Sequence, residues 1–158
     1  MLFTDEINWV EAAAYCFILL AVGGACELAR ALHKRSRVYR WAAGIGLVGA
    51  FLLFWANGAV GIIGSEDNPA NLMYGAVFLA GLIGSLLSRL KPRGMAITLF
   101  TAAVIQMLVP VFALLVWPAQ ASWGQAGVIG VFMINVFFAL LFVVSSLLFR
   151  RASIQPIK

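Results

Sequence analysis

Five long apolar runs dominate the sequence and leave little choice of fold. They cover residues 8–32, 41–64, 69–88, 95–117 and 126–149. Each is close to the roughly 20 residues that a helix needs to cross the hydrocarbon core of a bilayer. Only the first run contains charged residues, and these lie toward its ends: Glu11, Glu27 and Arg30. Because a helix satisfies its own backbone hydrogen bonds in lipid, the pattern predicts an all-α, polytopic integral membrane bundle of five transmembrane helices, forming one domain over residues 1–158.

The composition excludes a soluble globular protein. Hydrophobic residues make up 63% of the chain and charged residues 11%, whereas soluble domains carry roughly 25% charged residues. The net charge of +5 would suit a nucleic acid if the basic residues formed one patch. They fall instead into three short clusters between apolar runs, so we expect a lipid bilayer and no nucleic acid as partner.

The positions of lysine and arginine predict the orientation of the chain. The N-terminal segment and the loops over 65–68 and 118–122 contain neither residue. Since positively charged short loops stay in the cytoplasm, five spans place the N-terminus outside and the C-terminus inside. The basic residues bracket the first and third connections and the tail: Arg30, Lys34, Arg35, Arg37, Arg40, Arg89, Lys91, Arg93, Arg150, Arg151 and Lys158.

Local signals mark several helix ends. Asp67 or Asn68 can cap the third helix, with Pro69 at its first position, where a missing N–H is harmless. Trp41 lies at the start of the second run, and an amphipathic ring of this kind prefers the headgroup zone. Pro110 lies inside the fourth run and predicts a kink there.

Small residues predict where the helices pack against one another, because close approach of backbones drives association in lipid. The alternative is that the glycines make room for a ligand or allow a helix to flex. Residues 44–49 also match the pattern GxGxxG, but no strand precedes them, so we do not expect a dinucleotide there. The small residues form two stripes: Gly58, Gly61 and Gly64 in the second run, and Ala76, Ala80 and Gly84 in the third.

Gln106 and Asn135 form a predicted pair near the middle of the bilayer. They lie near the centres of consecutive antiparallel spans, at similar depth. Polar residues at this depth usually face the interior of a bundle, so the two amides are expected to hydrogen-bond. The pair has two interpretations, a structural contact between helices or the lining of a polar cavity.

A second polar group is predicted near the outer face. A carboxylate just inside the membrane can bind a proton or a cation, which makes Glu11 its sharpest member. The alternative is that Glu11 lies in water at headgroup level and that the amides cap loops and join helices. The members of this predicted ligand or proton pocket are Glu11, Tyr15, Asn57, Asn71 and Tyr74.

The sequence carries no recognisable catalytic or metal-binding motif. The patterns H-x-E, C-x-x-C and G-x-S-x-G are absent from it. The sequence therefore shows no motif for metal binding or for nucleophilic catalysis. His33 is the single histidine, which argues against a bis-histidine haem within one chain. The identity of any cofactor stays open, including one bound where two copies meet.

Two segments resemble a group of small, uncharacterised bacterial inner-membrane proteins. The first is Trp55 to Tyr74, WANGAVGIIGSEDNPANLMY, and the second combines PRGMA at 92–96 with TAAVIQ at 101–106. The resemblance implies a multi-pass protein of the bacterial inner (plasma) membrane. It implies no activity and no functional residue.

These features favour a non-enzymatic membrane protein that acts through helix packing, either as an accessory subunit or as a homo-oligomer. The competing interpretation is a carrier or binding protein for a small molecule, lipid, ion or proton, with an outward-facing polar pocket. Five spans are few for a monomeric transporter, so a carrier would need an oligomer. A membrane enzyme is the third and weakest class.

Overall fold

The computed structural model describes residues 30, 32–65, 67–116 and 123–154. The chain divides into two compact units, Met1–Arg35 and Ser36–Lys158. In the first unit, the described residues are the end of a helix and a turn in which Arg35 N donates to the carbonyl of Leu32 over 3.0 Å. Apart from its last residues, the predicted helix over 8–32 lies outside the described residues.

The described part of the second unit is all helical, and four stretches of it are long and apolar enough to cross a membrane. The third of five predicted spans combines the short 3-10 helix η1 with α3, and together they cover Pro69–Leu87. The elements are α2 (Arg37–Ala59), η1 (Pro69–Tyr74), α3 (Gly75–Leu87), α4 (Pro92–Val116) and α5 (Gly127–Ile154).

Helix α2 begins and ends before the limits that hydropathy predicts. The Ser36 side chain caps it by accepting from Tyr39 N over 3.3 Å. Beyond Ala59 the chain forms a loop in which Gly61 and Gly64 have φ of 67° and 79°, values that glycine adopts readily because it has no Cβ. The predicted stripe of Gly58, Gly61 and Gly64 is therefore wrong, since only Gly58 lies in the helix.

The junctions around α3 follow their predicted chemistry. Asn68 Oδ1 accepts from Ala70 N over 3.0 Å, so Asn68 provides the expected cap before Pro69. At the other end, Arg89 and Leu90 have φ of 49° and 56° and reverse the chain into α4. The Tyr39 hydroxyl of α2 donates to the Leu90 carbonyl over 2.7 Å, which anchors this turn.

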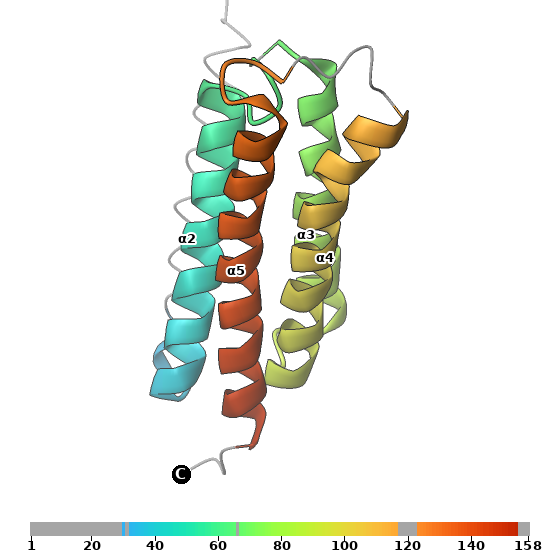
Figure 1. Ribbon diagram of the computed structural model, residues 1–158. Helices are drawn as coiled ribbons and strands as arrows, with labels where there is room; N and C mark the ends of the chain where they lie inside the picture. The colour runs from blue at the N-terminus through green and yellow to red at the C-terminus, as the bar shows by residue number, and fades with distance from the viewer. Residues whose placement is uncertain (1–29, 31, 66, 117–122, 155–158) are drawn as a thin grey trace, which may run out of the picture. The chain divides into compact units, whose positions relative to one another are not determined.

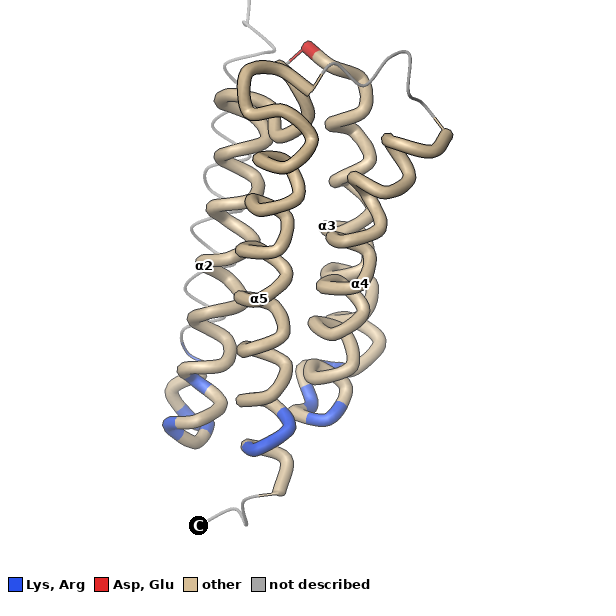
Figure 2. The backbone as a smooth tube through the Cα atoms, in the orientation of Figure 1, with Lys and Arg blue, Asp and Glu red and all other residues tan. Residues whose placement is uncertain are grey.

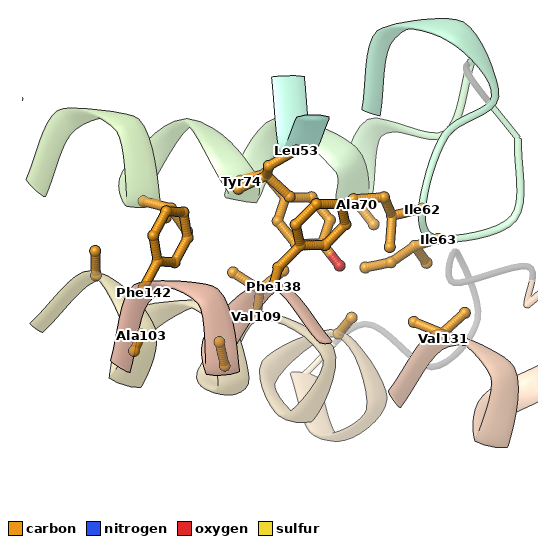
Figure 3. Packing of buried hydrophobic residues seen from close by; sticks show 14 residues of the cluster. Leu53, Ile62, Ile63, Ala70, Tyr74, Ala103, Val109, Val131, Phe138 and Phe142 are labelled. Atoms are coloured by element: carbon orange, nitrogen blue, oxygen red, sulfur yellow. The ribbon is translucent and has the colours of Figure 1, made fainter. Parts of the chain in front are cut away.

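Helix α5 is the centre of the bundle. It packs against both α2 and α4, while α3 packs against α4. Phe138 and Phe142 of α5 belong to one buried cluster with Leu53 of α2 and Tyr74 of η1, and the ring of Phe138 lies beside Tyr74 (Figure 3). Other buried members of this core include Ile62, Ile63, Ala70, Ala103, Val109 and Val131.

Small residues allow close approach at specific points of this bundle. A Cβ on Gly46 would lie 2.9 Å from both Leu99 Cδ1 and Ser145 Oγ, and one on Gly84 would lie 2.5 Å from Thr98. Gly84 thus confirms part of the predicted stripe on α3, although Ala76 is exposed. The GxGxxG stretch lies inside α2, where Gly46 and Gly49 contribute to packing.

Two serines join α5 to its neighbours at the end opposite the 60–65 loop. Ser145 Oγ donates to the Ala42 carbonyl of α2 over 2.6 Å, and Ser146 Oγ donates to the Ala96 carbonyl of α4 over 2.6 Å. Tyr39 and Phe149 stack edge to face close by, with ring centroids 4.9 Å apart. We refer to Tyr39, Ser145 and Ser146 as the serine end.

The two ends of the second unit differ in charge. Its described basic residues gather at the serine end, whereas Asp67, its one described acidic residue, lies at the other end (Figure 2). This distribution agrees with the alternation of basic loops in the sequence. The basic residues of this end are Arg37, Arg40, Arg89, Lys91, Arg93, Arg150 and Arg151.

Candidate functional site

Three polar side chains meet in the core, and we call Tyr74, Gln106 and Asn135 the polar cluster. Gln106 Nε2 donates to Asn135 Oδ1 over 2.9 Å, so the predicted bond between the two amides is confirmed. The Tyr74 hydroxyl donates to the same oxygen over 3.0 Å, and Asn135 Nδ2 lies 2.9 Å from the Tyr74 hydroxyl. All three side chains have an exposed fraction of 0%.

Each member of the cluster comes from a different helical element. Tyr74 ends η1, Gln106 lies in α4 one turn before Pro110, and Asn135 lies in α5. Asn135 Nδ2 also donates to the Val131 carbonyl of its own helix over 2.8 Å, which fixes the direction of the amide. Asn135 therefore links the third, fourth and fifth predicted spans through a single side chain.

The cluster has one acceptor without a partner. Gln106 Oε1 is buried and accepts no hydrogen bond. One turn further on, Pro110 has no N–H to donate to the backbone carbonyl of Gln106, so the usual helical bond at that carbonyl is missing. An unmatched buried acceptor costs about 1–3 kcal/mol.

In the outer polar group, the two described amides follow the alternative interpretation, in which amides hold loops and join helices. The Asn71 amide holds the 60–65 loop: its Oδ1 accepts from Ile62 N (3.1 Å) and Ile63 N (2.9 Å). Its Nδ2 donates to the carbonyls of Ser65 (2.7 Å) and Ile63 (3.3 Å). The amide of Asn71 is thus fully used by backbone groups.

Asn57 of α2 lies beside Asn71, whereas Tyr74 bonds elsewhere. Asn57 Nδ2 donates to the Asn71 backbone carbonyl over 3.3 Å, while Asn57 Oδ1 is buried without a partner. Tyr74 belongs to the polar cluster and not to the group around Asn57. Glu11 and Tyr15 lie outside the described residues. A polar residue can reach either a loop or the core from the same helical segment, and hydropathy does not distinguish the two.

The described residues offer hydrogen bonding but little acid–base or metal chemistry. No group of three His, Cys, Asp or Glu side chains that could hold a metal ion occurs among them. The polar cluster consists of two amides and one phenol, which are neutral groups. Sequence reasoning did not single out Ser145 and Ser146, the buried serines that join α5 to α2 and α4, although both lie inside an apolar run.

Comparison of the chain with protein-family models, with curated proteins and with solved structures finds no match. The class of protein therefore comes from the fold itself. Over its described residues the chain is an all-helical protein with four helices long and apolar enough to cross a membrane. Its candidate site is a neutral, hydrogen-bonded cluster within that bundle.

Proposed function

We propose that the chain is a non-enzymatic, five-helix protein of a bacterial inner membrane that acts through helix packing, as an accessory subunit or a homo-oligomer. The observation that carries this proposal is the use of the buried polar side chains. Asn71, Tyr74, Asn135, Ser145 and Ser146 all bond to other segments of the same bundle. Side chains used in this way stabilise a scaffold and are not free to bind a substrate.

The charge distribution supports the proposed topology, with the N-terminus outside and the C-terminus in the cytoplasm. Basic residues gather at one end of the second unit and Asp67 lies at the other (Figure 2), as the positive-inside rule requires for cytoplasmic loops at 89–93 and beyond 149. The resemblance of residues 55–74 to bacterial inner-membrane proteins supports the proposed location.

Reporter fusions test the topology. Alkaline phosphatase fused after Gln120 should be active and the same enzyme fused after Lys91 inactive, with the reverse pattern for a fluorescent protein that matures only in the cytoplasm. A fluorescent protein joined to the N-terminus distinguishes five spans from four. With five spans the N-terminus is outside and the reporter stays dark, whereas with four spans it is in the cytoplasm and fluoresces. Activity after Lys91 would contradict the orientation.

Native mass spectrometry of the protein, released from its own membranes in a mild detergent, tests the assembly. The expected result is a stable homo-oligomer or a complex with a second membrane protein.

A matched pair of variants on α3 locates the contact: Gly81 is half-buried and Gly75 exposed, and a Cβ on either meets nothing within 4 Å. If a partner packs against α3 at Gly81, Gly81→Leu should weaken the assembly. Gly75→Leu serves as the control. A monomer without any partner would overturn the packing function.

The second candidate is a carrier or binding protein, and the unpartnered oxygens of Gln106 and Asn57 favour it. Two buried acceptors suit a ligand that brings hydrogen-bond donors. A monomer that retains a small molecule in native mass spectrometry, and loses it in Gln106→Met, would support this candidate. If the flux of ligand or protons is unchanged in Glu11→Gln, Glu11 is not required for it, and the carrier candidate loses its most distinctive predicted residue.

A further inference from the structure

An open hollow of about 400 Å³ lies at the basic end of α2, lined by Arg37, Arg40, Trp41 and Gly44. These residues lie in the first turns of the helix, on the face opposite to its buried residues Tyr39, Ala42 and Gly46. At 100° per residue, one face of a helix collects such positions at spacings of three and four. The hollow lies at the same end of the bundle as the serine end, but its lining contains none of Tyr39, Ser145 and Ser146 and no member of the polar cluster.

One side of the hollow is cationic. Arg37 and Arg40 are exposed and stand about one turn apart. Among the described residues of the second unit, Asp67 is the single carboxylate, and it lies at the opposite end (Figure 2). Guanidinium groups bind phosphate oxygens through paired, charge-assisted hydrogen bonds. The charge of this wall therefore complements a phosphate group.

The other side of the hollow is apolar. Trp41 has an exposed fraction of 70%, and a Cβ on Gly44 would meet nothing within 4 Å. Gly44 therefore leaves a notch between Trp41 and Val48, and Phe51 continues the same exposed face further into the span. A flexible hydrocarbon chain fits a surface of this kind, because it can lie against the backbone where no side chain projects.

We propose that this hollow binds an anionic phospholipid, with its phosphate on Arg37 and Arg40 and one acyl chain in the notch at Gly44. The cationic wall lies at the end of a membrane span and the notch runs from it toward the bilayer interior, which is the order of groups in a lipid molecule. Basic pockets at this depth are a known means of binding anionic headgroups. The site requires a membrane-spanning α2 but does not depend on the proposed role in assembly.

Native mass spectrometry of the full-length protein tests the site by counting bound lipids. The probes are phosphatidylglycerol and phosphatidylcholine with identical acyl chains. The double variant R37Q/R40Q should reduce the affinity for phosphatidylglycerol by about 30-fold, from roughly fivefold for each basic residue, and leave phosphatidylcholine binding unchanged. R150Q/R151Q is the matched control, because it removes two exposed arginines from the same end but outside the hollow, and it should retain binding.

A further variant separates a lipid from a free anion. Gly44→Leu fills the notch without meeting another part of the described bundle, so it should weaken lipid binding while inorganic phosphate binds as before. The proposal is overturned if the protein binds both lipids equally. It is also overturned if the two double variants reduce binding to the same extent, because binding would then depend on the overall positive charge of this end and not on the hollow. It is also overturned if inorganic phosphate displaces the lipid and Gly44→Leu has no effect. Circular dichroism checks that every variant retains its helices.

Discussion

The polar cluster and the serine end join the same helix, α5, to its neighbours by two different kinds of hydrogen bond. In the cluster, side chains bond to side chains, and Asn135 must satisfy both Tyr74 and Gln106. At the serine end, Ser145 and Ser146 donate to backbone carbonyls, which every residue type supplies. The first arrangement depends on the identity of three residues, whereas the second depends on one residue at a time and on close helix packing.

This difference predicts that the largest loss of stability follows from the removal of Asn135. Asn135→Leu keeps a similar volume but leaves the Tyr74 hydroxyl and Gln106 Nε2, both buried, without their shared partner. Each such group costs about 1–3 kcal/mol, so we expect a loss of about 3 kcal/mol in the free energy of unfolding, measured by denaturation in bicelles. Val136→Ala, at the exposed neighbouring position, should change it by less than about 0.5 kcal/mol. Similar losses in both variants would show that the cluster adds no specific stability.

The next largest effect is expected at the loop held by Asn71. Asn71→Ala removes the acceptor of Ile62 N and Ile63 N, two amides of buried residues. We expect a loss of about 2 kcal/mol, because water reaches a loop more easily than the core. Hydrogen exchange should become much faster at these two amides and stay slow in α5. Unchanged exchange at Ile62 and Ile63 would contradict the role of Asn71.

Close packing can be tested with two glycines of α3. Gly84→Ala places a methyl group against Thr98 of α4. The β-branched side chain of Thr98 is restricted at χ1 and cannot easily rotate away. Overpacking of this kind costs about 1–3 kcal/mol, and we expect about 1.5 kcal/mol. Gly81→Ala meets nothing within 4 Å and should be neutral or stabilising, since alanine favours the helix by up to about 1 kcal/mol. Equal effects would mean that α3 does not approach α4 as closely as Gly84 requires.

The smallest effects are expected at the serine end. Ser145→Ala and Ser146→Ala each remove one hydrogen bond but leave the backbone carbonyl of the partner in its own helix. Such bonds contribute about 0.6 kcal/mol in membrane bundles, so each variant should lose about that much in the same denaturation assay. A loss as large as that of Asn135→Leu would remove the distinction between the two regions.

The sequence predicted features that depend on hydropathy or on local chemistry. The four described spans and the cap at Asn68 belong to this group, as does the contact between Gln106 and Asn135, whose similar depth in adjacent spans brings them together. It did not predict that α2 ends at Ala59, because Gly61 and Gly64 continue an apolar run while their backbone turns away from the helix. Nor did it separate Tyr74 from Asn71, because hydropathy does not show that two residues of the same short helix η1 bond to different parts of the bundle.

The central position of α5 has a consequence for the biosynthesis of the protein. A chain is synthesised from its N-terminus, so α2, α3 and α4 are made before the helix that lies between α2 and α4. Until α5 arrives, the Gln106 amide and the Tyr74 hydroxyl lack their common partner in Asn135, and the notch at Gly46 lacks Ser145. The native core can therefore close only after α5, the last described helix, has been made.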